Sequence, residues 1–316
     1  MLYQYSNFFF PFLILLGIVA GVLLIIYKVK KLKLDKKSFD RLLTLFALSG
    51  ALFYIGSRLF DDLFHRLNGE LDHKGGITFM AGMITAVTVF VVCFIIFLKP
   101  IRKMFFKIVN IVVIGIVLGH AIGRIGCFLS GCCYGKITDS KIGVVFPGTY
   151  DVQKNGSLYY IHLYGSDAYE DLFQKRMKEY IKENNIARYN DTSERTYYYD
   201  YFYSEEVALE VANDANSYAL STRILPTQLF ESLFLFILFG VLMIIPNLQG
   251  GIYLMSYGAF RFAIEFLRND NRGSVLLGIS PSQLLSILII VVGIIYLIFN
   301  IRQNKLLKIE ENQPTE

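Results

Sequence analysis

Two ionisable side chains lie inside an otherwise apolar stretch of the chain. His120 and Arg124 are four residues apart, so both would project from the same face of a helix. If the stretch crosses a membrane, a charge there is costly and marks a candidate functional residue. Arginine can grip a phosphate through two parallel hydrogen bonds, and Gly123 and Gly126 would let a ligand or a neighbouring helix approach the backbone. The simpler alternative is an arginine that only reaches for the interface.

A second group of ionisable residues has the same spacing. Arg261 and Glu265 are four residues apart, Tyr257 precedes them by about one turn, and Arg268 follows. The arginine and the glutamate could simply neutralise each other. However, an ion pair that only stabilises packing can often be replaced by apolar residues at little loss. We therefore favour one site that contains both arginines, Arg124 and Arg261, together with a carboxylate.

Polar residues also open the apolar segment after Pro226. Gln228 and Glu231 fall in what the proline predicts to be the first turn of a helix. Both a capping role and a role in the site fit this position.

Three cysteines cluster directly after Arg124. Cys127, Cys132 and Cys133 could bind zinc with His120, form a disulfide, or pack as small residues. Their spacing matches no closed Cys/His zinc motif, so we expect packing and predict neither a metal nor a cofactor.

Long apolar segments must carry these residues. Apolar side chains make up 54% of the chain and gather into runs long enough to cross about 30 Å of hydrocarbon. The sequence therefore predicts an all-α polytopic membrane protein with about seven transmembrane helices, at residues 8–27, 41–57, 76–98, 106–126, 228–245, 250–268 and 281–300.

Basic residues fall at the ends of the expected helices rather than on one face. The net charge of +5 is thus a topology signal, and no nucleic-acid partner is expected. Lysine and arginine are abundant in segments 28–41, 99–107 and 302–308, which predicts an external N-terminus and an internal C-terminus. The extended polar region at residues 136–224 would then form a small extracytoplasmic head of mixed structure. The expected domains are membrane helices one to four at 1–135, the head at 136–224, membrane helices five to seven at 225–300, and a cytoplasmic tail at 301–316.

These motifs together resemble the bacterial prolipoprotein diacylglyceryl transferase family. Gly123–Gly135 is similar to the family's Gly-Arg-x-Gly-Asn-Phe-x-Asn-x-Glu-x-x-Gly signature, and Pro226–Glu231 to its Pro-Ser-Gln-Leu-Tyr-Glu motif. Tyr257–Arg268 is similar to its Tyr-Gly-x-x-Arg-x-x-x-Glu-x-x-Arg motif. Gly56–Leu59 resembles its Gly-Ala-Arg-Leu, and Ser282–Ser286 its Gly-Gln-Ile-Leu-Ser. The matches run in order from the second to the seventh expected helix.

The chain departs from the family pattern at three places. Cys127 and Cys132 stand where the family has asparagine and glutamate, and residues 78–82 lack the histidine that opens the family's third helix. His120 is our candidate to replace that histidine, because it lies one turn before Arg124.

The resemblance implies transfer of the diacylglyceryl group of phosphatidylglycerol to the lipobox cysteine of a preprolipoprotein in the bacterial plasma membrane. The expected partners are phosphatidylglycerol, or a related phospholipid, and the preprolipoprotein signal peptide, and we expect a monomer. The expected catalytic residues are Arg124, Arg261, Glu265 and His120. The expected substrate-binding residues are Arg58, Gly123, Gly126, Cys127, Cys132, Gln228, Glu231, Tyr257 and Arg268.

Two other functions stay open on the sequence. One is a phospholipid-headgroup transferase with another acceptor, and the other is a non-catalytic lipid-binding protein or transporter. Transporters of this size commonly show paired repeats with broken helices, and the sequence shows none. His120 or Glu265 could supply the base that an enzyme of this kind needs.

Overall fold

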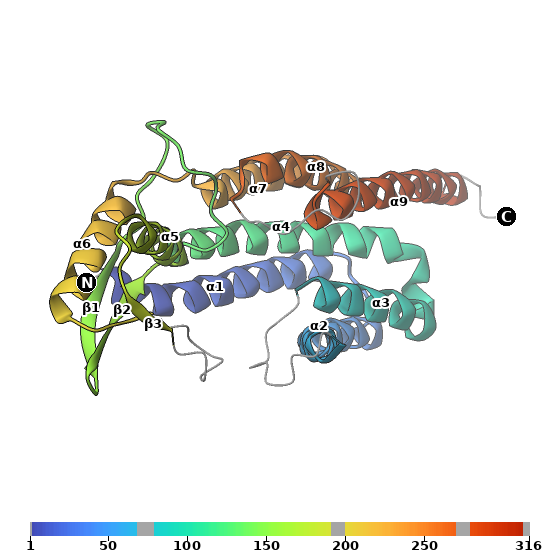
Figure 1. Ribbon diagram of the computed structural model, residues 1–316. Coiled ribbons are helices and arrows are strands. Elements are labelled where there is room, and N and C mark those ends of the chain that lie inside the picture. Colours follow the sequence, from blue (N-terminus) through green and yellow to red (C-terminus); the bar gives the residue numbers. More distant parts are fainter. Residues whose placement is uncertain (1, 68–78, 191–199, 270–278, 312–316) are drawn as a thin grey trace. The chain divides into compact units, whose positions relative to one another are not determined.

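The computed structural model describes residues 2–67, 79–190, 200–269 and 279–311 (Figure 1). Internal contacts divide the chain into a larger unit, residues 1–23 with 113–316, and a smaller unit, residues 24–112. The helices are α1 (Leu2–Lys30), α2 (Lys36–Leu67), α3 (Phe79–Phe97), α4 (Phe105–Ser130), α5 (Asp167–Glu183), α6 (Glu205–Ser221), α7 (Thr227–Ile244), α8 (Gln249–Ile264) and α9 (Pro281–Glu311). The described residues also form two 3-10 turns, η1 (Lys99–Met104) and η2 (Glu265–Leu267). They form four strands, which are β1 (Gly148–Asn155), β2 (Leu158–Gly165), β3 (Arg188–Asn190) and β4 (Asp200–Phe202).

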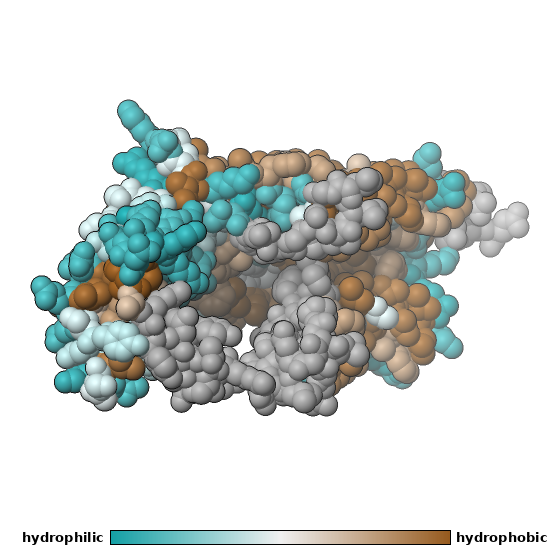
Figure 2. All heavy atoms as spheres, in the orientation of Figure 1, coloured by the Kyte–Doolittle hydropathy of each residue, from teal (hydrophilic) through white to brown (hydrophobic). Residues whose placement is uncertain are grey.

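A helix stands at each of the seven expected membrane positions. Among the described residues, five spans within α1, α2, η1–α4, α7 and α9 are long and apolar enough to cross a membrane, and α3 is a shorter apolar helix. Large side chains such as Ile237 and Ile244 are exposed on α7, and Figure 2 shows apolar surface along the long helices. Exposed apolar helix faces are expected where lipid is the solvent. The helical, polytopic membrane architecture is therefore confirmed.

The sixth and the third of the expected helices differ from the described helices at one end. The sixth was expected to reach residue 268, but α8 ends at Ile264, because the chain tightens into η2 and becomes extended at Arg268. The third was expected to begin at residue 76, and residues 76–78 lie outside the described part of the chain.

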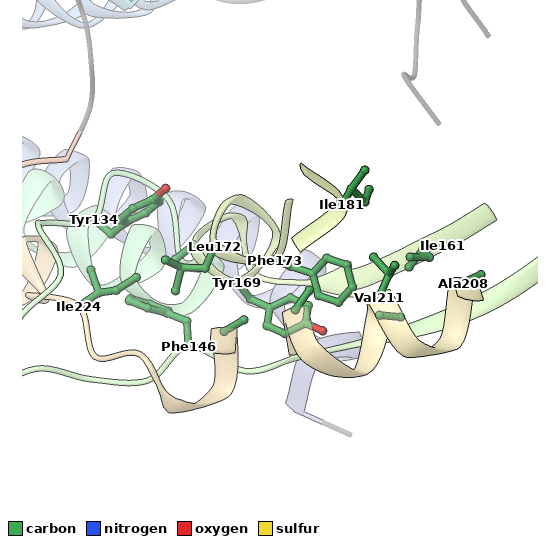
Figure 3. Packing of buried hydrophobic residues seen from close by; sticks show 14 of the residues in the cluster. Tyr134, Phe146, Ile161, Tyr169, Leu172, Phe173, Ile181, Ala208, Val211 and Ile224 are labelled. Atoms are coloured by element: carbon green, nitrogen blue, oxygen red, sulfur yellow. The ribbon is translucent and has the colours of Figure 1, made fainter. Parts of the chain in front are cut away.

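The expected head has mixed structure. Its four strands form one antiparallel sheet in the order β1-β2-β4-β3. Buried side chains from the sheet, α5 and α6 form a core that includes Tyr169, Phe173 and Val211 (Figure 3). Gly148 and Gly165 are paired across β1 and β2. A Cβ on either would lie 2.1–2.2 Å from the Tyr169 ring, so only glycine leaves room for that ring.

Glycines also let α1 approach α4 within the larger unit. Gly17 and Gly21 on α1 lie opposite Gly119 and Gly115 on α4, a Gly-x-x-x-Gly pair on each helix. A Cβ on Gly17 would lie 2.7 Å from the Gly119 carbonyl oxygen, and one on Gly21 would lie 2.5 Å from that of Gly115. The two backbones are therefore in direct contact, as small residues permit between membrane helices.

Gly21→Ala is expected to destabilise the protein by about 1–3 kcal/mol, because the new methyl group would push against backbone that cannot rotate away. Gly240→Ala on α7 is the matched control, since a Cβ there meets nothing within 4 Å. The control should be neutral or slightly stabilising, because alanine is the better helix former. Thermal unfolding in detergent compares the two variants. Equal midpoints would show that the contact between α1 and α4 is looser than described.

The smaller unit has its own apolar core. Val29, Leu42, Phe94 and Ile108 are fully buried there, and η1 joins α3 to α4.

Candidate functional site

Backbone hydrogen bonds hold three chain segments together where α4 ends, α7 begins and α8 ends. The amide of Gly135 donates to the Leu225 carbonyl at 2.9 Å, and the amide of Lys136 donates to the Leu267 carbonyl at 2.8 Å. Leu225 returns a bond to the Lys136 carbonyl at 3.0 Å. These bonds fix the helix ends that carry the polar motifs.

A short row of polar side chains at the start of α7 binds the end of α4. The Thr227 hydroxyl donates to the Cys133 carbonyl at 3.0 Å, and the Gln228 amide donates to the Cys132 carbonyl at 2.6 Å. One turn further on, the Ser232 hydroxyl donates to the Ala121 carbonyl at 2.8 Å. Gln228 therefore links the start of α7 to the chain at the end of α4, instead of capping α7.

Glu231 is the centre of the first polar group. Its side chain is 1% exposed, and its Oε1 lies 2.9 Å from the Arg124 guanidinium and 3.5 Å from His120 Nε2. The Tyr257 hydroxyl donates to the same oxygen at 3.0 Å, and the Tyr257 ring meets the His120 ring edge-on at 5.2 Å between centroids. The arginine and the tyrosine hydroxyl thus compensate the buried negative charge of the Glu231 carboxylate. Glu231 thus belongs to the site and does not cap α7.

A second polar group surrounds Arg261. Its guanidinium donates to Glu265 Oε2 at 2.7 Å and to the Ser282 hydroxyl at 3.1 Å. The other oxygen of Glu265 accepts a bond from the Ser280 hydroxyl at 2.9 Å, and Arg268 Nε lies 3.9 Å from Glu265 Oε2. Ser280 and Ser282 were not among the predicted site residues. Ser282 opens a stretch that matched a family motif, and this match was the available signal.

The two groups are neighbours on one helix. Tyr257 of the first group and Arg261 of the second lie one turn apart on α8. Two polar atoms of the first group, Arg124 Nε and Gln228 Oε1, are buried and have no hydrogen-bond partner in the described part of the chain. A buried donor and a buried acceptor left open cost free energy unless a ligand or water satisfies them. The site is thus equipped to bind a polar ligand beside two guanidinium groups.

The cysteine cluster lies against this site. The chain turns sharply after α4, with positive φ at Gly131 (73°) and Cys133 (59°), and the Cys132 amide donates to the Cys127 carbonyl at 3.2 Å. Cys127, Cys132 and Cys133 are free thiols. Contact with Cys132 and burial raise the pKa of the Cys133 thiol.

The remaining predicted site residues are two glycines on α4 and an arginine on α2. Gly123 and Gly126 face α1, because a Cβ on Gly123 would lie 3.3 Å from the Ile14 side chain and one on Gly126 would lie 3.4 Å from that of Leu13. The structure therefore places both glycines in helix packing. Arg58 lies on α2 in the smaller unit.

Comparison with known proteins gives one family and several relatives. The family model described as prolipoprotein diacylglyceryl transferase matches residues 7–299. A phosphatidylglycerol–prolipoprotein diacylglyceryl transferase 2 from Clostridium perfringens is 30% identical over 206 residues, which cover 63% of this chain and 53% of that protein. The match thus spans about half the length of that relative. The corresponding transferase of Streptococcus uberis is 26% identical over 305 residues, 91% of this chain and 90% of that protein. That of Proteus mirabilis is 28% identical over 273 residues, 80% of this chain and 74% of that protein.

Proposed function

Because the chain belongs to the prolipoprotein diacylglyceryl transferase family, we propose that it transfers the diacylglyceryl group of phosphatidylglycerol to the cysteine thiol of a preprolipoprotein. The observation that carries the proposal is the joint site of Arg124, His120, Glu231, Tyr257 and Arg261. It combines two guanidinium groups for a phosphate diester with an imidazole whose Nε2 lies 3.5 Å from a carboxylate oxygen.

The reaction makes one carbon–sulfur bond and breaks one carbon–oxygen bond. The acceptor sulfur attacks the glyceryl carbon that bears the phosphate, and glycerol phosphate leaves with the electron pair of the broken bond. Negative charge grows on the leaving phosphate, where Arg124 and Arg261 would stabilise it. The acceptor thiol gives up its proton to a base.

His120 is the proposed base. Its Nε2 faces Glu231 Oε1 at 3.5 Å, so a neutral imidazole with its proton on Nε2 keeps the Nδ1 lone pair free for the thiol proton. Its side chain is 26% exposed, which is more than that of Arg124 or Glu231. Glu265 was the other candidate base, but both of its oxygens are already engaged by Arg261 and Ser280.

The function is tested in a bacterial strain depleted of its own prolipoprotein diacylglyceryl transferase. The chain is expected to restore lipoprotein processing, measured by the mobility shift of a reporter lipoprotein. Absence of processing, together with consumption of phosphatidylglycerol by the purified protein, would favour a transferase with another acceptor. Absence of both would exclude a transferase.

His120→Gln is expected to lower turnover by about 10²-fold or more, because glutamine keeps a polar side chain but cannot take the thiol proton. Binding of phosphatidylglycerol should be unchanged, since both arginines remain. Turnover and lipid binding are measured on the same purified protein. His162→Gln, on β2 of the head, is the matched control and should leave both unchanged. Normal turnover in folded His120→Gln would remove His120 from the mechanism.

We also propose that the N-terminus and the head at 136–224 face outward, that the tail at 301–316 faces the cytoplasm, and that the membrane domains are 1–135 and 225–300. The lysine and arginine bias supports this orientation. We further propose a monomer with seven spans in the bacterial plasma membrane, acting on phosphatidylglycerol and a preprolipoprotein.

Cysteine labelling tests the orientation. In a variant without the native cysteines, Ser157→Cys in the exposed turn between β1 and β2 should react with an impermeant maleimide on intact cells. Lys305→Cys on α9 should react only after lysis. The reverse pattern would invert the proposed topology.

A further inference from the structure

The smaller unit contains a groove whose lining includes none of the proposed reaction residues. It has a volume of about 1030 Å³ and is lined by side chains of α2, α3 and η1, all within residues 24–112. This volume is at the upper end of the range of small-molecule sites and is large enough for part of a lipid. The lining residues are divided by chemistry, which indicates what the groove could hold.

One end of the groove is cationic. Lys36, Lys37, Arg41 and Lys99 line it, with Asp40 as the single acid among its lining residues. The side chains of Lys36, Lys37 and Lys99 are exposed at the ends of α2 and η1. The Arg41 guanidinium donates to the Phe97 carbonyl at 3.4 Å, so that arginine also ties α2 to α3.

The rest of the groove is lined mostly by apolar side chains of α2 and α3. Leu45, Leu48, Ile96 and Phe97 form its wall, and Leu48, Ile96 and Phe97 are 44–62% exposed. Leu48 lies twelve residues beyond Lys36 on α2, a rise of about 18 Å. With Lys36 at the depth of the lipid headgroups, this rise would place Leu48 within the hydrocarbon.

We infer that this groove binds an anionic phospholipid, with its phosphate at Lys36, Lys37 and Lys99 and an acyl chain along Leu48 and Phe97. Basic residues beside a membrane helix attract anionic headgroups, and basic pockets between such helices are known to bind them. A zwitterionic lipid would leave the excess positive charge unmatched. A basic peptide segment would be repelled by the same lysines. Arg124 and Arg261 belong to the larger unit, and none of the residues that line this groove is among the proposed reaction residues.

A single tryptophan can report on this groove alone, because the chain contains none. Leu48→Trp places one in the apolar wall. The variant is reconstituted in phosphatidylcholine nanodiscs that contain a low fraction of phospholipid with brominated acyl chains, which quench tryptophan fluorescence on contact. Brominated phosphatidylglycerol is expected to quench more strongly than brominated phosphatidylcholine. Lys36→Gln, Lys37→Gln and Lys99→Gln together should lower this preference at least tenfold, since each lysine near a lipid surface is worth about fivefold in affinity.

A second triple variant provides the matched control. Lys30→Gln, Lys33→Gln and Lys107→Gln remove the same charge from exposed lysines of the same unit that do not line the groove. The preference for phosphatidylglycerol should survive these changes, and also the charge-preserving change of the three groove lysines to arginine.

Three results would overturn the inference. Equal quenching by brominated phosphatidylglycerol and brominated phosphatidylcholine would mean ordinary contact with the bilayer. If the groove variant and the control variant lost the preference for phosphatidylglycerol equally, the cause would be general charge attraction. Loss of the preference on addition of inorganic phosphate would indicate a site for free phosphate. Fluorescence quenching does not depend on turnover, so the result is independent of whether the proposed transfer reaction occurs.

Discussion

Replacing Glu231 with glutamine is expected to destabilise the protein by about 3–5 kcal/mol and to abolish turnover. The carboxylate is buried and is the shared partner of Arg124, His120 and Tyr257. Glutamine has nearly the same shape but no charge, so the Arg124 guanidinium would keep its desolvation cost and lose its counter-charge. His120 would lose the carboxylate that lies 3.5 Å from its Nε2. Denaturant titration in mixed micelles gives the free energy of unfolding, and lipoprotein processing gives the activity.

Glu183→Gln is the matched control for this variant. Glu183 is also paired with an arginine, Arg176, at 3.2 Å, but its side chain is 58% exposed. Exposed ion pairs contribute little to stability because water and salt screen them. The control should therefore unfold like the parent. If Glu231→Gln also unfolds like the parent, contacts other than the ion pair with Glu231 stabilise the buried Arg124 side chain. The proposed central role of Glu231 would then be contradicted.

Replacing either site arginine with lysine is expected to lower turnover by about 10²–10³-fold, the usual effect of losing one donor to transition-state charge. Lysine keeps the positive charge but has no planar fork. In the described geometry, Arg261 uses two nitrogens at once, one for Glu265 and one for Ser282. A lysine at 261 cannot reproduce that pair and also face a phosphate. Steady-state rates with phosphatidylglycerol and a lipobox peptide measure the effect.

Arg176→Lys is the matched control, because Arg176 also binds with two nitrogens, to Asp214 at 2.6 and 3.3 Å, but lies in the head. Its change should leave turnover unaltered. Parent-like turnover in both Arg124→Lys and Arg261→Lys would assign these arginines to structure alone.

The sequence predicted what is local along a helix. Run length and charge bias predicted the seven helical segments, and the four-residue spacing placed His120 with Arg124 and Arg261 with Glu265 on shared helix faces. These features depend only on helix period and on the thickness of the hydrocarbon. They need no knowledge of how helices pack.

The partners across helices could not be predicted in the same way. Arg124 pairs with Glu231 on another helix, and capping was an equally good interpretation of that glutamate. Glycines illustrate the same point. Gly123 and Gly126 were expected beside the substrate, but they face α1. A glycine pattern predicts close approach, whereas which neighbour approaches depends on the tertiary fold.

The backbone pairing at the base of the head has a consequence for modularity. Residues 135–138 run antiparallel to 223–225, through bonds such as Gly135 to Leu225 at 2.9 Å and Thr138 to Arg223 at 2.9 Å. The head is therefore an insertion whose two ends lie side by side, like the ends of a hairpin. Such an insertion can lengthen, shorten or change its sequence without altering the distance between the helices that it joins. The end of α4 and the start of α7, which hold Arg124 and Glu231, are thus tied to each other directly by backbone hydrogen bonds and not only through the fold of the head.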